Sequence, residues 1–243
     1  MKQLGFTCHQ SDAGIFINKE HRIMVIAYVD DCVFLGTNLK RVLQAKAAFM
    51  QIWECWDLGK AKKNFRMRIK HEGYKIIKCF DMQELNTANA PLPAGYEPEE
   101  NKEKGTDSLW LEYQSVIRSL LYIMIGTRPD ISFAVTKMAQ FSANPSPKKL
   151  QAAKHIITYL KMTGTMSLIF DGASNKGLIA FTDSDWASDK IKCWSQTGYF
   201  FQLAEASFSW QSQAQKTVAL SNTKAEYMVC PTVVNKWSGL NPF

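Results

Sequence analysis

Residues 26–34 read Ile-Ala-Tyr-Val-Asp-Asp-Cys-Val-Phe, so two adjacent carboxylates, Asp30 and Asp31, interrupt a run of apolar, strand-forming residues. This pattern predicts a β-hairpin with apolar arms and the two acids at its tip. Adjacent carboxylates repel each other and resist desolvation, and a bound divalent cation offsets that cost. Acid pairs also form ordinary turns, because aspartate tolerates tight backbone geometry, and from residues 28–31 alone the ordinary turn is the better interpretation.

The composition of the chain excludes several classes of protein. Its 243 residues fit one large domain or two modest ones. No apolar stretch approaches the roughly 20 residues of a membrane helix, and the N-terminus lacks the apolar core of a signal peptide. None of the six cysteines forms a CxxC pair, which argues against a disulfide framework or a zinc site. We therefore expect no membrane partner and a location inside the cell, in the cytoplasm or nucleus, rather than secretion.

The charge of the chain is the first indication of a partner. A net charge of +7 suits an acidic polymer, and nucleic acid is the usual one. A solvated basic surface is the commoner explanation of such a charge. Charge alone therefore leaves nucleic-acid binding as one of two open interpretations.

Apolar residues in the first part of the chain alternate as in strands or recur every three to four residues as in a helix. The alternation predicts short strands at 14–17, 22–28 and 32–35. Residues 39–53 have the helical spacing. Residues 65–70 alternate apolar and basic side chains, as a half-exposed strand does, and residues 74–77 are either its hairpin partner or the start of a helix.

The remainder of the chain changes character twice. Proline, glycine and charged residues dominate 86–107, which predicts a loop or linker. Three helical segments follow, with proline before or at the start of the second and third, at 109–126, 131–142 and 147–161. Strand patterns come next, at 166–170, 178–182, 198–203 and 207–210. A last helix is expected from about Thr223 towards Trp237.

Several motifs follow one another in a characteristic order. They are Tyr-Val-Asp-Asp at 28–31, Arg-Pro-Asp at 128–130, Thr-Asp-Ser-Asp-Trp at 182–186, Lys-Thr-Val-Ala-Leu-Ser at 216–221 and Ala-Glu-Tyr at 225–227. In this order they resemble the polyprotein of copia-type long-terminal-repeat retrotransposons. The matching region is the second half of the reverse transcriptase, the connection, and the first half of the ribonuclease H domain.

The resemblance implies an α+β chain in four parts. A partial polymerase palm, with its hairpin and sheet, is expected at 1–85 and a loop or linker at 86–108. A helical thumb or connection region is expected at 109–164, and a truncated ribonuclease-H-like domain with a partial mixed sheet at 165–243. The family activities are RNA-directed DNA synthesis and cleavage of RNA in RNA–DNA hybrids, so an RNA–DNA hybrid or another nucleic acid is the implied partner.

The same resemblance implies the site residues and the cofactor. Asp30 and Asp31 match the acid pair of the polymerase palm, which helps to hold two Mg²⁺ ions. Asp183 matches the first catalytic acid of the ribonuclease H and Glu226 the second, again as ligands of Mg²⁺. Magnesium prefers carboxylate and phosphate oxygens, so these residue types suit it.

Local sequence offers a structural alternative for each nuclease residue. Asp183 and Asp185 flank a serine and are typical of a turn cap, although Asp183 is preferred as the family match because it directly follows a predicted strand. Glu226 fits the third helical position of a capping box begun by Thr223, and on local sequence alone that is the better interpretation. Lys224 departs from the family pattern, in which an acid is usual.

Basic and aromatic residues likewise have two interpretations. The basic side chains that could contact phosphates are better explained as solvated helix faces; they are Arg118, Arg128, Lys148, Lys149, Lys154 and Lys161. The tryptophans are better explained as core or interface anchors than as platforms for bases; they are Trp53, Trp56, Trp110, Trp186 and Trp210.

The resemblance also predicts incomplete active sites. A two-metal polymerase needs a further aspartate on a strand before the hairpin, and Asp12, the one other aspartate before Asp30, sits in a predicted turn. The last two acids of the nuclease belong beyond its first helix, where this sequence ends. We therefore expect a catalytically inactive retrotransposon fragment with weak or absent Mg²⁺ binding. The alternatives are a nucleic-acid-binding module without enzymatic activity, or an enzyme completed in trans by another polyprotein fragment.

Overall fold

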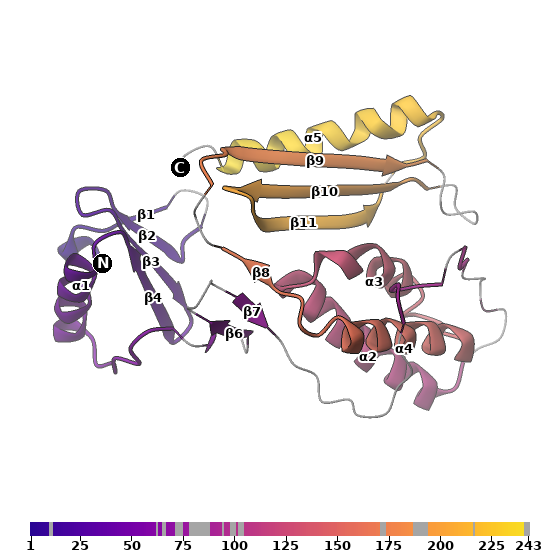
Figure 1. The fold of residues 1–243 in the computed structure, drawn as a ribbon, viewed down its shortest axis with the longest axis horizontal. Coiled ribbons are helices and arrows are strands. Elements are labelled where there is room, and N and C mark those ends of the chain that lie inside the picture. The colour runs from indigo at the N-terminus through magenta and orange to yellow at the C-terminus, as the bar shows by residue number, and fades with distance from the viewer. Residues whose placement is uncertain are drawn as a thin grey trace. The chain divides into compact units, whose positions relative to one another are not determined.

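The computed structural model describes residues 1–9, 12–61, 63–64, 67–70, 75–77, 88–93, 95–97, 101, 105–170, 174–186, 194–215 and 217–240. The chain divides into two compact units, Met1–Ala61 and Lys62–Phe243 (Figure 1). Helices and antiparallel sheets are both present, which confirms the α+β class. The four-part division expected from the sequence stays a prediction.

The first unit is a four-stranded antiparallel sheet with one helix. A 3₁₀ turn, η1 (Lys2–Leu4), precedes the strands. The sheet has the order β1-β2-β3-β4, with bounds Thr7–Cys8, Ile15–Asn18, Ile23–Tyr28 and Asp31–Gly36. Helix α1 spans Leu39–Ile52 and packs against β4. The strands and the helix expected from the sequence over this region are confirmed to within two residues.

Alternation along the strands decides which face of this sheet is covered. Ile23 and Val25 of β3 are buried together with Phe6. Phe34 of β4 and Val42 of α1 pack against this cluster. The side chain of Asn38 accepts a hydrogen bond from the backbone N–H of Arg41 at 3.3 Å and caps the start of α1. The period-2 pattern therefore fixes the side of β3 and β4 that faces the helix.

The second unit begins with short strands and continues with helices. Strands β5 (Lys63–Asn64), β6 (Met67–Lys70), β7 (Lys75–Ile77) and β8 (Leu168–Ile169) form an antiparallel sheet in that order. Because β7 pairs with β6, Lys75–Ile77 supply the hairpin partner and not a helix start, and residue 74 lies outside the described residues. The described residues between 88 and 106 hold no helix or strand, as the proline-rich sequence predicts.

Three helices and a 3₁₀ turn form the largest core of the protein. They are α2 (Asp107–Gly126), η2 (Pro129–Ile131), α3 (Ser132–Ala139) and α4 (Pro147–Met162). Thr106 and Ser146 cap α2 and α4 with their side chains, and Pro147 occupies the first turn of α4. Within the apolar core between the helices, the hydroxyl of Tyr113 donates to the carbonyl of Met138 at 2.7 Å.

The C-terminal part is a three-stranded antiparallel sheet covered by one helix. Its order is β11-β10-β9, with bounds Ala206–Ala214, Gln196–Leu203 and Leu178–Asp185. Helix α5 (Asn222–Leu240) packs against β9 and β10, where Tyr199 and Phe201 are buried with Val229 and Val233 (Figure 1). The opposite face of this sheet lies towards α2 and α3.

Two hydrogen bonds join the helices to that sheet within the second unit. The indole N–H of Trp210 on β11 donates to the carbonyl of Met124 at 2.9 Å. The hydroxyl of Thr136 on α3 donates to the carbonyl of Ser212 at 3.0 Å. One face of the sheet is therefore covered by α5 and the other is approached by α2 and α3.

Candidate functional site

The acid pair lies at the tip of a tight hairpin, as the sequence predicts. Tyr28 of β3 pairs with Asp31 of β4, which leaves only Val29 and Asp30 in the turn. Both aspartates are exposed. The apolar arms therefore hold two adjacent carboxylates at a tip that is open to solvent.

The backbone at this tip is strained. Val29 has φ of +53° and is 87 % exposed. A β-branched residue rarely adopts positive φ, and the cost is of order 1–3 kcal/mol. The pairing of Tyr28 with Asp31 imposes this geometry, because a two-residue turn between twisted strands requires positive φ.

The thiol that follows the acid pair is not suited to join it as a metal ligand. Burial raises the pKa of Cys32, and the neighbouring Cys55 and Asp31 raise that pKa further. Only the thiolate binds metal well, and a raised pKa keeps the thiol protonated at neutral pH. The hairpin tip therefore offers oxygen ligands.

The first nuclease candidate, Asp183, lies inside strand β9. The sequence predicts a strand that ends at 182, but the ladder with β10 continues and pairs Asp183 with Gly198 and Asp185 with Gln196. The turn-cap interpretation of these two acids is therefore wrong, because pairing with β10 keeps both in extended backbone. The carboxylate of Asp183 accepts a hydrogen bond from the N–H of Ser184 at 2.9 Å.

The second candidate, Glu226, is the fifth residue of α5, just after its first turn, and is exposed. The expected capping box is wrong, because the helix begins at Asn222, one residue before Thr223. Ser221 takes the capping role instead, and its hydroxyl accepts from the N–H of Lys224 at 3.2 Å. The position of Glu226 is therefore not explained by capping.

Asp183 and Asp185 line a groove on the face of the sheet that meets the helices. The groove has a volume of about 710 Å³, and η2 and α3 form its other side through Asp130 and Phe133. Ser184 lies between the two acids and is buried, so alternation directs it to the opposite face, under α5. Local sequence gave no signal for this groove, which depends on the contact of helices with a distant sheet.

A buried glutamine connects the two strands and the helix beneath the nuclease candidates. The amide nitrogen of Gln215 lies 3.3 Å from the hydroxyl of Ser184, 2.9 Å from that of Thr197 and 2.9 Å from the carbonyl of Ala225. Ser184 follows Asp183 in the chain, and Ala225 precedes Glu226. Sequence reasoning missed Gln215, because an isolated glutamine after a strand has no distinctive pattern.

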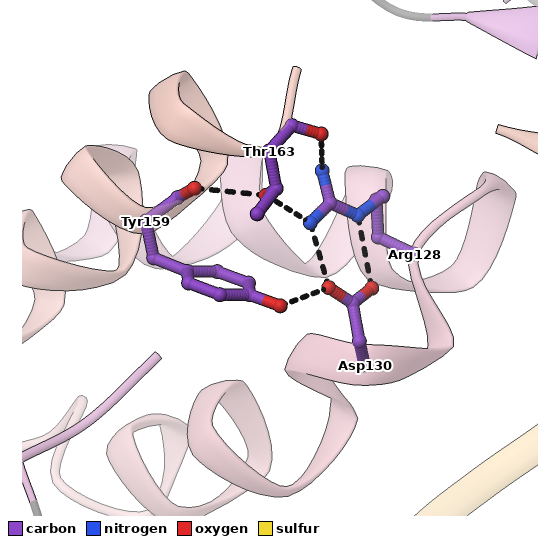
Figure 2. Close-up of polar contacts among 4 residues, drawn as sticks. All are labelled: Arg128, Asp130, Tyr159 and Thr163. Carbon is purple, nitrogen blue, oxygen red and sulfur yellow. Dashed lines mark hydrogen bonds and ion pairs between the residues drawn. The ribbon is translucent and has the colours of Figure 1, made fainter. Parts of the chain in front are cut away.

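Arg128 belongs to a buried polar cluster and is 6 % exposed (Figure 2). Its guanidinium binds both carboxylate oxygens of Asp130, at 2.9 and 2.6 Å, and donates to the carbonyl and hydroxyl of Thr163. The hydroxyl of Tyr159 donates to Asp130 at 2.8 Å. The expectation of a solvated arginine is therefore wrong. The spacing Arg-Pro-Asp, which places the two charges two residues apart, was the available signal.

The pKa shifts of Asp130 and Arg128 agree with this geometry. Burial alone would raise the pKa of Asp130, but the hydrogen bonds and charge of Arg128, with the Tyr159 hydroxyl, hold that pKa below its ordinary value. Burial likewise opposes the charge of Arg128, and Asp130 outweighs it, so the pKa of Arg128 is raised. The ion pair between Arg128 and Asp130 is local to η2, and the hydrogen bonds to Thr163 and from Tyr159 join it to the end of α4.

Other basic residues divide between core and surface. Lys149 is 2 % exposed and lies 4.2 Å above the ring of Phe141, so the expectation of a solvated lysine is wrong there. Four others are exposed as expected; they are Arg118, Lys148, Lys154 and Lys161. Lys154 pairs with Glu112 at 2.6 Å.

The tryptophans likewise divide into exposed side chains and side chains that anchor segments of the chain. Trp56 is 83 % exposed, so it is no core residue. Trp53 stacks on Phe49 with ring centroids 4.4 Å apart, and Trp110 is partly exposed. Trp186 and Trp210 anchor segments through their indole N–H groups, Trp186 by donating to the carbonyl of Ala219 at 2.9 Å.

The donor sets suit a weakly held magnesium ion. Within the described ranges, no three side chains of His, Cys, Asp or Glu gather in a way that would hold a metal. Asp30 and Asp31 offer two carboxylates at one tip. Magnesium is usually bound by one or two protein carboxylates together with water and substrate phosphates, so two acids fit a partial site. In the described part of the chain, no helix combines the length and apolarity needed to cross a membrane.

Comparison with known proteins gives three informative relatives. The chain is 33 % identical over 250 residues to a retrovirus-related Pol polyprotein from transposon TNT 1-94 of Nicotiana tabacum, covering 94 % of this chain and 19 % of that protein. It is 41 % identical over 116 residues to secreted RxLR effector protein 161 of Plasmopara viticola, covering 48 % of this chain and 82 % of that protein. It is 25 % identical over 249 residues to a putative transposon Ty5-1 protein of Saccharomyces cerevisiae, covering 96 % and 80 %.

The matches differ in how much of each relative's length they cover. The chain spans about a fifth of the tobacco polyprotein. No protein-family model matches the chain, and no solved structure matches it.

Proposed function

This chain belongs to the copia-type retrotransposon Pol polyproteins, and we propose on that premise that it carries part of a reverse transcriptase and part of a ribonuclease H. The observation that carries the proposal is the hairpin tip, where the pairing of Tyr28 with Asp31 places two adjacent, exposed carboxylates on a two-residue turn. A polymerase site needs oxygen ligands in such a position.

In the polymerase part, Asp30 and Asp31 are the proposed Mg²⁺ ligands. Bound magnesium stabilises negative charge on reacting phosphate oxygens. The paired arms of β3 and β4 fix the direction of the tip, and solvent exposure lets a nucleic-acid end approach it. Repulsion between the adjacent carboxylates favours uptake of a cation.

In the nuclease part, Asp183 on β9 and Glu226 on α5 are the proposed ligands. The ladder with β10 fixes the backbone of Asp183, and α5 carries Glu226 near its start. The substrate class is RNA paired with DNA. Each site holds two of the acids that its chemistry needs, and we propose that the chain alone binds Mg²⁺ weakly and catalyses neither reaction.

The sheet edges indicate how such sites are completed. In the described sheets, β4 and β9 are edge strands, and each carries or begins with a proposed ligand, Asp31 or Asp183. An edge strand presents unpaired backbone groups to which another strand can add. Further carboxylates on an added strand, from the same polyprotein or from another polyprotein fragment, would lie beside the acids already present.

The experiment measures metal binding and catalysis on the 243-residue chain. Titration with Mn²⁺, followed by electron paramagnetic resonance, compares the parent with Asp30→Asn/Asp31→Asn. We expect the double variant to lose a weak site, whereas Asp57→Asn, which removes an exposed acid paired with Lys46 in the same unit, should not. Equal binding by the parent and the double variant would refute the hairpin site. Extension of a primer on an RNA template, or cleavage of a hybrid, would refute the proposed inactivity.

Nucleic-acid binding without catalysis is the second candidate, and the surface charge favours it. The net charge is +7, and exposed basic residues lie on α2 and α4; they are Arg118, Lys148, Lys154 and Lys161. Phosphate contacts release counterions, so affinity for an RNA–DNA hybrid should fall with salt. A log–log slope near zero between 50 and 200 mM salt, roughly the range over which such contacts are measured, would refute this candidate.

Completion in trans is tested by mixing. A purified fragment that carries the upstream fingers and palm of a related polyprotein is added to the chain, and primer extension is measured. Activity that appears only in the mixture, and that Asp31→Asn abolishes, would support completion. Continued inactivity at increasing fragment concentration would count against it.

A further inference from the structure

The groove between the C-terminal sheet and the helices has an aromatic end and an acidic end. On the sheet side, the strand ladders set the groove-facing residues in three rows across β9, β10 and β11. The rows are Phe181 with Phe200 and Trp210, then Asp183 with Gly198 and Ser212, then Asp185 with Gln196. Ser132 and Phe133 of α3 line the helical side. Aromatic rings and carboxylates therefore face the same space.

The aromatic end is accessible to a ligand. Phe181 is 53 % exposed and Phe133 is 45 % exposed, and the ring centroids of Phe181 and Phe200 lie 6.4 Å apart. Concave surfaces lined by aromatic side chains with a few polar groups are typical of binding sites, which usually have volumes of roughly 300–1,000 Å³. The groove, at about 710 Å³, falls in that range.

Gly198 keeps the acidic end of the groove open. It lies on the middle strand between Asp183 and Ser212. A Cβ added at Gly198 would meet two backbone oxygens at 4.0 Å and no nearer atom of the described residues. A larger side chain would therefore project into the groove. Glycine weakens a strand, and inside a sheet it often marks the close approach of a ligand.

The hydroxyl of Ser132 points to a ligand independently of the sheet. Ser132 lines the groove from α3 and is 6 % exposed. Its Oγ has no hydrogen-bond partner among the described residues. A buried hydroxyl without a partner lowers stability, and such a group in a native protein calls for an explanation. A hydrogen-bond donor seated in the groove would supply the missing partner.

The charge of the groove selects the kind of ligand. Among the described residues that line it, three are aspartates and none is lysine, arginine or histidine. Arg128 compensates the charge of Asp130, which leaves the exposed carboxylates of Asp183 and Asp185. The groove is thus locally acidic in a chain whose net charge is +7. Such a surface repels phosphate groups and attracts a cation.

We propose that this groove is a docking site for an arginine-bearing segment of a partner protein. The guanidinium is planar and charged, carries five donors, binds a carboxylate with two parallel hydrogen bonds and stacks on aromatic rings. It therefore matches the carboxylates, the Ser132 hydroxyl and the aromatic row together. A lysine ammonium matches the charge but lacks the planar fork. The inference does not rest on the proposed polymerase or nuclease, because Asp185 belongs to neither site.

The test titrates short peptides into the 243-residue chain and follows its amide signals by nuclear magnetic resonance. The probe is an acetylated Leu-Arg-Leu amide, and the matched control carries citrulline, which has nearly the same shape without the charge. EDTA is present, so that no divalent cation occupies Asp183. The arginine peptide should shift the amides of Phe181, Gly198 and Ser212 and bind about tenfold more tightly than the citrulline peptide, as expected for a charge-assisted hydrogen bond.

Three variants locate the binding. Asp185→Asn should lower the affinity for the arginine peptide about tenfold and leave that for the citrulline peptide unchanged. Gly198→Leu fills the space above β10 and should abolish binding of both peptides. Glu112→Gln removes an exposed acid of α2 that does not line the groove and should change neither affinity. Asp185→Asn alters an exposed side chain and carries the test if Gly198→Leu does not fold.

The contrary outcomes are specific. Equal affinity for the two peptides, or no shift at the groove amides, refutes the proposal. An equal loss of affinity in Glu112→Gln and Asp185→Asn refutes it too, because the overall charge then explains binding. Self-association that Asp185→Asn abolishes would assign the groove to a second copy. Displacement of the peptide by an RNA–DNA hybrid with Mg²⁺ would assign it to nucleic acid. Mn²⁺ binding, measured separately, decides the proposed metal sites whichever result is found.

Discussion

Replacing Asp130 with alanine removes the carboxylate that pairs with the buried guanidinium of Arg128 (Figure 2). The charge of Arg128 then keeps its two contacts with Thr163 but loses its counter-charge, and the hydroxyl of Tyr159 loses its acceptor. We expect the helical core of the second unit to lose stability, since a buried charge without a partner is costly.

The expected magnitude follows from burial. Breaking a buried ion pair by removing one partner costs about 3–5 kcal/mol. The side chain of Arg128 is 7 % exposed and that of Asp130 is 26 % exposed, so water reaches one side of the pair. We therefore expect the lower end of the range, about 3 kcal/mol, which corresponds to roughly a hundredfold increase in the opening equilibrium.

Hydrogen exchange of amides in α2, α3 and α4 measures this directly in the native chain. Arg128→Met should also destabilise the core, but the double variant Arg128→Met/Asp130→Ala should lose much less than the sum, because no unpaired charge remains. Glu112→Ala, which breaks the exposed pair with Lys154 between α2 and α4, is the matched control and should cost under about 0.5 kcal/mol. Additive effects of the two single variants would refute the reasoning.

Three other predictions concern single features of the structure. Folding lowers the pKa of Asp130, so the stabilisation from its carboxylate is present above the ordinary carboxyl pKa and is lost as the pH falls through the pKa of the folded state. The difference in opening free energy between the parent and Asp130→Ala should therefore shrink on acidification. A difference that stays constant would contradict this. Ser221→Ala should destabilise the start of α5 by about 1 kcal/mol, whereas Thr223→Ala should have little effect, as amide exchange in 222–230 can show; the reverse order would restore the capping box. Val29→Gly should slow amide exchange in the β3–β4 hairpin by relieving the positive φ, worth about 1 kcal/mol, and faster exchange would contradict the strain.

Much of the local structure follows from the sequence because its causes are local. The hairpin at 26–34 is fixed by alternating apolar residues around two acids, and the structure closes it at Tyr28 and Asp31. Helices α1, α2 and α4 are indicated by their apolar patterns, and α4 also by Pro147 at its start. The order of motifs, in turn, identifies the family.

Local signals fail where two interpretations share one pattern. Ser221 and Thr223 both lie at the start of the last helix and both are good caps, so sequence alone did not separate them. Asp183 and Asp185 suit a turn as well as a strand, and pairing with β10 selected the strand. The backbone conformation was decided in each case by neighbours outside the segment.

Whether a charged or amide side chain is buried was decided only by the tertiary structure. Arg128 meets Thr163, 35 residues away in sequence, and Gln215 meets Ser184, 31 residues away. A charge or an amide can be buried only where the folded chain supplies partners for its hydrogen bonds, and those partners come from other helices and strands. The sequence by itself determined the hairpin, the helices and the family, because neighbouring residues dictate periodicity and turns. Which polar groups lie inside depended on contacts between elements far apart in the chain.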